Sequence, residues 1–175
     1  MVVFSDLLLS SSAASNQDTV SFVNKTMDYF YNGSPTYEDP YMEGVDLVVI
    51  LGNVVNGSDW DGMDSNYFQD RWDMLMQVIV PYEAKVAFTL GHLDARGNIK
   101  DPYKIVEYVN SYGNISLTFP APQSIDGTTF YGLPIKDVVC GDDFTKAGYI
   151  VFLDSNSKEC LYSQLEAKEP AGCVS

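Results

Sequence analysis

The 175-residue chain is predicted to be an α/β protein built on a parallel sheet, and three observations carry this prediction. Short apolar runs at residues 2–4, 46–51 and 86–90 have the length and the β-branched and aromatic content of buried strands. Segments with helical periodicity lie between these runs. Connections of this length imply right-handed crossovers between parallel strands. We therefore expect a βαβαβ start followed by further strands.

The first predicted strand leads through a Ser-rich loop into a helix. We expect Asn16 to cap this helix, because its side-chain oxygen can accept a hydrogen bond from an unpaired backbone N–H. The helix should run to about Tyr31, where the turn-forming residues 32–35 follow. Apolar side chains recur on one of its faces: Val20, Val23, Met27, Phe30 and Tyr31.

Two more helices follow the second and third strands. The helix expected at about 66–80 ends before Pro81 and carries an apolar stripe formed by Phe68, Trp72, Leu75, Met76 and Ile79. The helix expected at about 102–111 carries a shorter stripe formed by Ile105, Val106 and Val109.

The pattern changes after the third helix. Residues 116–119, 128–133 and 149–153 are predicted strands without intervening helices. Residues 159–175 are ambiguous, and a short helix followed by a frayed tail is compatible with them.

Charge and composition narrow the classes of partner. The net charge of −14 argues against nucleic acid or an anionic membrane as the main partner, since both need a cationic surface. No apolar run approaches ~20 residues, so we expect no transmembrane helix, and the N-terminus has no signal-peptide pattern. The compartment stays open. The cysteines, Cys140, Cys160 and Cys173, are compatible with one disulfide or with three thiols.

Polar residues follow each of the three predicted parallel strands. Asp6, Asn53, His92 and Asp94 all stand where a strand ends. Ligands of parallel sheets bind beyond the carboxyl ends of the strands, so these side chains are expected to converge. They are also common turn and cap residues, and this simpler interpretation stays open.

The same three segments resemble the first metal-binding motifs of the calcineurin-like metallophosphoesterases, in particular the purple acid phosphatase-like branch. The family patterns D-x-H, G-D-x-x and G-N-H-D/E correspond here to residues 6–8, 52–55 and 91–94. Residues 131–135 and 149–155 resemble later core strands. The resemblance implies a layered α/β sandwich over residues 1–156, incomplete at its C-terminus, followed by a tail at 157–175.

The resemblance assigns a role to each position in the first two motifs. Asp6 matches an aspartate that binds metal in the family. Leu8 stands where a histidine ligand is expected, and its side chain has no lone pair to offer. Asn53 stands at the position of the aspartate that bridges both metal ions.

The third motif is altered as well. His92 replaces a ligand asparagine, and Leu93 occupies the position of the histidine that contacts phosphate. Asp94 matches the acidic residue that orients that histidine. The family takes further histidine ligands from its second half, but His92 is the single histidine of this chain.

These replacements argue against a centre with two metal ions. Two divalent cations about 3.5–4 Å apart repel each other by roughly 17–19 kcal/mol at an effective dielectric constant of 20, as a gross interaction. Anionic ligands must offset this repulsion, and Asn53 is neutral. We expect either no metal or one weakly bound divalent metal held by Asp6, Asn53 and His92, with Asp94 supporting these ligands.

Three functional interpretations follow from the resemblance and from the replacement of the family's metal-binding residues. The preferred one is a degenerate phosphoesterase domain, impaired or inactive, that acts as a pseudophosphatase by binding a protein partner or by contributing structure. No residue is assigned as catalytic. One alternative is a weak, metal-dependent phosphomonoesterase, a hydrolase with a single metal ion. The other is a fragment or subunit that needs a partner to complete its fold.

Overall fold

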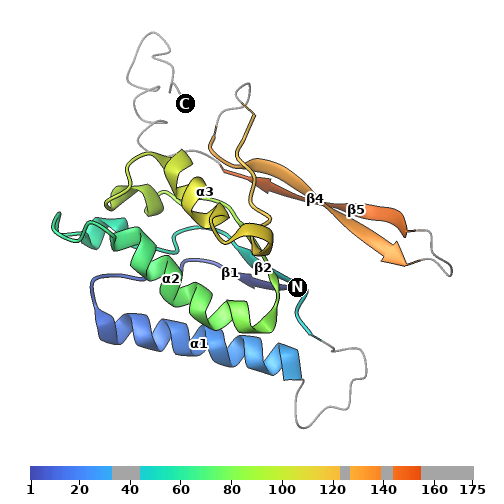
Figure 1. Cartoon of the computed structure of the whole chain (residues 1–175), viewed down its shortest axis with the longest axis horizontal. Helices are drawn as coiled ribbons and strands as arrows, with labels where there is room; N and C mark the ends of the chain where they lie inside the picture. Colours follow the sequence, from blue (N-terminus) through green and yellow to red (C-terminus); the bar gives the residue numbers. More distant parts are fainter. Residues whose placement is uncertain (33–43, 123–126, 139–143, 155–175) are drawn as a thin grey trace. The chain divides into compact units, whose positions relative to one another are not determined.

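The structure is a computed structural model that describes residues 1–32, 44–122, 127–138 and 144–154 (Figure 1). The chain divides into two compact units, Met1–Thr118 and a second one that begins at Phe119. The mixture of helices and strands agrees with the predicted α/β class. The single domain predicted over residues 1–156 stays a prediction.

The first unit contains the predicted parallel sheet. Its strands are β1 (Val2–Phe4), β2 (Leu47–Ile50) and β3 (Lys85–Phe88), in the order β1-β2-β3. Both pairs of neighbours are parallel, so all three strands end at the same edge of the sheet. Each strand is within two residues of its prediction at either end.

Three helices accompany the sheet: α1 (Ala13–Asn32), α2 (Tyr67–Ile79) and α3 (Pro102–Asn110). α1 and α2 lie side by side (Figure 1). Short 3-10 turns complete the unit, namely η1 (Gly57–Asp59), η2 (Val80–Tyr82), η3 (Asp94–Arg96) and η4 (Gly113–Ile115).

The hydrophobic core joins one face of the sheet to the helices. Strand alternation and register put six apolar residues on that face: Val2, Phe4, Val48, Ile50, Val86 and Phe88. The predicted stripes of α2 and α3 are buried in full, and Val23 and Met27 bring α1 into the same cluster. Each large side chain that leaves water in this way contributes about 1.5–3 kcal/mol.

Trp72 lies at the centre of the core. Its ring stacks on Phe68 with centroids 6.0 Å apart and meets the Phe88 ring edge-on at 5.2 Å. Its indole N–H is buried without a hydrogen-bond acceptor. Packing therefore outweighs the cost of that unpaired donor at this position.

Two predictions of local structure are wrong. Asn16 does not cap α1, because the helix begins earlier, at Ala13, and Asn16 is buried inside its first turns. Residues 116–119 do not form a strand: Ser116 makes one isolated parallel bridge to Val86, and η4 immediately precedes it. After this bridge, the segment contacts β3 through the Thr118 side chain, whose Oγ1 accepts the Phe88 N–H.

The second unit contains an antiparallel hairpin of β4 (Phe130–Val138) and β5 (Phe144–Leu153). Both strands are longer than predicted, and a register shift interrupts their pairing between Ile135 and Lys136. Tyr131 and Phe152 stack across the hairpin with ring centroids 4.6 Å apart.

Some predictions cannot be compared with the structure. The tail at 157–175 and all three cysteines lie outside the described residues. Within the described residues, no helix combines the length and the apolar character that crossing a bilayer requires.

Candidate functional site

The candidate site is formed by the turns that follow β1, β2 and β3. The first two turns stay paired beyond the strands through backbone hydrogen bonds. Asp6 N–H donates to Gly52 O at 3.2 Å, and Leu8 N–H donates to Asn53 O at 3.0 Å. The convergence expected from a parallel sheet is therefore present for these turns.

The Asn53 side chain connects all three turns. Its Nδ2 donates to Asp6 Oδ1 at 2.8 Å, and its Oδ1 accepts the Leu93 N–H at 3.0 Å. Both functional atoms of the amide thus have protein partners. An amide can fill this position because it offers a donor on one side and an acceptor on the other, which a carboxylate does not.

Asp94 holds the second and third turns together from below the surface. Its side chain is fully buried. Oδ2 accepts the N–H groups of Asn53 at 2.9 Å and Gly91 at 2.8 Å, and Oδ1 accepts the Val55 N–H at 3.0 Å. Burial raises the pKa of Asp94 to about 6, although these backbone hydrogen bonds act in the opposite direction.

Two glycines allow the turns to approach this closely. A Cβ atom on Gly52 would lie 2.3 Å from Gly91 N, and a Cβ atom on Gly91 would lie 2.2 Å from Asn53 N. Gly52 also has a φ of +79°, which disfavours any other residue there. Neither position can take a side chain without displacing backbone.

Left-handed backbone conformations gather at the same place. Four non-glycine residues of the described chain have a positive φ, and three of them, Asp6 (53°), Leu8 (52°) and Asn53 (48°), belong to these turns. Such conformations cost of order 1–3 kcal/mol each and cluster at ligand sites and switch regions. The hydrogen bonds that link the three turns offset this conformational cost.

Asp6 and His92 form the exposed part of the site. Asp6 accepts a hydrogen bond from the Ser5 hydroxyl, which is the main reason why its pKa is lowered. The hydrogen bond from Asn53 and the charge of His92 act in the same direction. His92 is exposed and lies close enough for its charge to influence Asp6.

The structure thus links Asp6, Asn53 and Asp94 in one hydrogen-bonded network, with His92 coupled to it electrostatically. Leu8 is 41% exposed and supplies no ligand atom. The sequence did not single out Ser5, although a hydroxyl directly before an aspartate at a strand end is a usable signal.

Metal-ligating side chains are sparse around this network. Among the residues that the structure describes, no group of three or more His, Cys, Asp or Glu side chains is arranged to hold a metal ion. Oxygen and nitrogen donors are present at Asp6, Asn53 and His92, but the Asn53 amide is occupied on both sides.

Comparisons with known proteins add no assignment: no family model, no curated protein and no solved structure matches the chain.

Proposed function

We propose that the chain carries a degenerate phosphoesterase scaffold of the calcineurin-like, purple acid phosphatase-like type. Its catalytic chemistry is impaired or lost, and its role is to bind a partner or contribute structure, as in a pseudophosphatase. One observation carries the proposal. The side chain of Asn53 spans Asp6 and the Leu93 N–H at the strand ends, where the resemblance places a metal-bridging aspartate.

The hydrogen-bond pattern supports this proposal chemically. The Asn53 N–H group points its proton at Asp6 Oδ1, so the amide already satisfies the carboxylate oxygen that a metal would need. Asp94 accepts backbone N–H groups with both oxygens, and Leu93 offers no acid or base. The residues present therefore do not fit a two-metal centre, and no catalytic step is derived for one.

The proposal is tested by metal uptake and phosphatase activity. We expect no heat beyond dilution when Mn²⁺ or Zn²⁺ is titrated into the folded chain by calorimetry. We also expect no hydrolysis of 4-nitrophenyl phosphate that co-purifies with the chain. Activity that follows the chain through successive columns contradicts the proposal.

A substitution sharpens this test. Asn53→Asp places a second carboxylate against Asp6, so it should lower stability without metal and create affinity for divalent cations. Thermal unfolding with and without Mn²⁺ measures both effects. Asn114→Asp makes the same chemical change at an exposed position and should produce neither.

A weak hydrolase with a single metal ion is the second candidate. The observation in its favour is that His92 lies near the exposed Asp6 carboxylate. On this reading, Asp6→Ala and His92→Ala each reduce hydrolysis of 4-nitrophenyl phosphate at least tenfold, whereas Asp59→Ala in η1 does not. Equal activity in all three variants rejects it.

A subunit that needs a partner is the third candidate, and the position of β1 at the edge of the sheet favours it. A monodisperse monomer in sedimentation, with one cooperative thermal transition, contradicts that reading.

A further inference from the structure

The two edges of the parallel sheet differ. Beyond β3, the Leu117 N–H donates to Val86 O at 2.7 Å, and the Phe88 N–H donates to Thr118 Oγ1 at 3.0 Å. β1 pairs with β2 on one side, and no described residue pairs with its other side. The outer edge of β1 is therefore the open edge in the described part of this sheet.

The backbone of β1 directs polar groups toward that open edge. Phe4 O accepts the Leu51 N–H at 2.9 Å, and the Asp6 N–H donates to Gly52 O at 3.2 Å, so these groups face β2. Backbone groups of successive residues alternate between the two sides of a strand. The N–H and C=O groups of Val3 and Ser5 consequently face outward.

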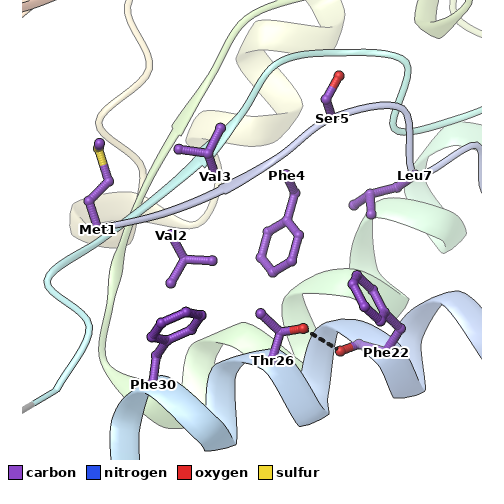
Figure 2. A pocket seen from close by; sticks show the side chains of 9 residues that line it. All are labelled: Met1, Val2, Val3, Phe4, Ser5, Leu7, Phe22, Thr26 and Phe30. Atoms are coloured by element: carbon purple, nitrogen blue, oxygen red, sulfur yellow. Dashed lines mark hydrogen bonds between the residues drawn. The ribbon is translucent and has the colours of Figure 1, made fainter. Parts of the chain in front are cut away.

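A pocket of about 420 Å³ lies beside this edge, between β1 and α1 (Figure 2). Val2 and Phe4 point from the strand toward the helix, whereas Val3 and Ser5 point away from it (Figure 2). All four residues line the pocket. The pocket therefore reaches the edge of the strand and is not confined to one face of the sheet.

Helix α1 forms the other wall with Phe22, Thr26 and Phe30, which follow one another at intervals of four residues (Figure 2). Phe22 is 61% exposed, and Val3 on the strand side is 48% exposed. Open apolar edges of this kind are normally protected in soluble proteins, because they invite pairing with another chain.

Two acidic residues are close in sequence to residues that line the pocket, although neither lines it. Asp6 is exposed and follows the carboxyl end of β1. Asp18 is exposed and precedes Phe22 by one helical step of four residues, so it continues the same row of α1. α1 also carries Lys25 and Asp28, and the whole chain has a net charge of −14.

We propose that the outer edge of β1 binds an extended peptide segment of a partner protein as an added strand. The backbone of the segment pairs with Val3 and Ser5, and its alternate apolar side chains enter the pocket against Phe22. Basic residues of the segment lie against Asp6 and Asp18. A second copy of the chain is the poorer occupant, because it brings a further −14 charge to the interface.

The proposal deepens the binding role proposed above and rests on it, and Asp6 is the one residue that it shares with the metal-related test. The binding experiments are done in EDTA, so metal uptake and peptide binding are measured independently. Failure of one leaves the result of the other unchanged.

The probes are two synthetic peptides with blocked ends, Lys-Lys-Val-Thr-Val-Thr-Val and its reverse, Val-Thr-Val-Thr-Val-Lys-Lys. They place the lysines next to Asp6 and Asp18 in antiparallel and parallel addition, respectively. We expect one of them to bind in a fluorescence titration and to slow hydrogen exchange at the Val3 and Ser5 amides, measured by NMR. N-methylation of alternate peptide nitrogens blocks edge pairing and should abolish that protection.

Protein variants locate the contact. Phe22→Ser removes an exposed apolar contact and should weaken binding about tenfold. Asp18→Asn removes an exposed charge and should weaken binding about two- to fivefold. Met63→Ser and Glu107→Gln make matched changes at exposed positions in a loop and on α3, and should leave binding unchanged. Circular dichroism checks that all four variants are folded.

Three outcomes overturn the proposal. The first is that neither peptide binds at millimolar concentration. The second is binding that Phe22→Ser and N-methylation leave intact, which places the peptide elsewhere. The third is a concentration-dependent dimer in sedimentation that Phe22→Ser dissociates, which assigns the edge to a second copy of the chain.

Discussion

Asp94 shows how a single buried side chain can hold two turns of a site together. Its carboxylate is fully buried, and its two oxygens accept backbone N–H groups from the turns after β2 and β3. Backbone donors to a carboxylate stabilise the ionised form, while burial opposes it. Burial dominates, so the pKa rises to about 6. The folded protein therefore binds this proton more tightly than the unfolded chain does.

The first prediction concerns the pH dependence that follows. The folded pKa of Asp94 lies above the unfolded value, so its contribution to the free energy of unfolding grows as pH falls from 7 to 4. A shift from 3.8 to about 6 corresponds to about 3 kcal/mol in full, and about four-fifths of it is gained by pH 4, where the unfolded carboxyl is only partly protonated. Urea unfolding of wild type and Asp94→Asn at each pH measures the difference between the two proteins.

At pH 7, Asp94→Asn should also cost about 1–3 kcal/mol, because an amide NH₂ group cannot accept the backbone N–H groups now bound by one oxygen. Glu107→Gln on the surface of α3 serves as the control and should change neither quantity. A difference between wild type and Asp94→Asn that stays constant from pH 7 to pH 4 contradicts the assignment.

At the scale of single residues, the sequence predicted where the site residues lie better than it predicted which atoms they contact. Asp6, Asn53 and Asp94 could be placed together, because parallel strands end at one edge. Their individual partners could not be predicted, since the Asn53 amide and the Asp94 carboxylate depend on atomic approach between distant turns. The close contact of Gly52 with Gly91 has the same origin: it exists only once the sheet has formed.

At the scale of secondary-structure elements, the start of α1 differs from its prediction. Asn16 is buried on the helix, where its Oδ1 accepts the Ser10 N–H at 2.7 Å and its Nδ2 donates to Ser10 O at 2.9 Å. Arg71 of α2 also donates to Ser10 O, at 3.0 Å. Asn16 therefore fixes the loop that leads into the helix, and not the helix terminus itself.

The second prediction is that Asn16→Ala lowers the free energy of unfolding by about 1–3 kcal/mol, because the Ser10 N–H loses a buried acceptor. Urea unfolding at pH 7 measures this loss. Asn32→Ala, at an exposed position near the other end of α1, should stay within about 0.5 kcal/mol of wild type. Equal losses in both variants would contradict the assigned role of the Ser10 contact, because Asn→Ala raises helix propensity and by itself favours the folded helix.

The helices whose apolar residues recur regularly at helical spacing were predicted most accurately. α2 and α3 bury every residue of their predicted stripes, since helical spacing and burial agree there. Residues 116–119 have strand composition, but their backbone pairs with the sheet only at the isolated Ser116 bridge, because pairing depends on where the chain leaves β3. Composition alone cannot show how long a segment stays beside its neighbour.

Net charge acts on the whole molecule. A charge of −14 makes the compact state repel itself, and salt screens this repulsion. The third prediction is therefore that the urea midpoint rises with NaCl, as the Debye length falls from ~30 Å at 0.01 M to ~8 Å at 0.15 M. Unfolding followed by circular dichroism measures the midpoint.

A second salt with a different cation serves as the control for this prediction. Tetramethylammonium chloride at equal ionic strength should raise the midpoint as NaCl does, because screening depends on charge and concentration. Stabilisation by Na⁺ alone would instead indicate a specific cation site. A midpoint that is insensitive to both salts would show that the carboxylates are already well separated or paired in the folded protein.

The two tryptophans have different surroundings, so their intrinsic fluorescence can report on two separate parts of the molecule. Trp72 is fully buried, whereas Trp60 is half-buried on the loop after Asn53, with its Nε1 donating to Asp64 O and Lys100 5.1 Å above its ring. In Trp72→Phe, the emission of the remaining tryptophan, Trp60, reports changes near the strand ends. In Trp60→Phe, the emission of Trp72 reports loosening of the hydrophobic interior. Events in these two places can thus be told apart by emission wavelength, without attaching a dye.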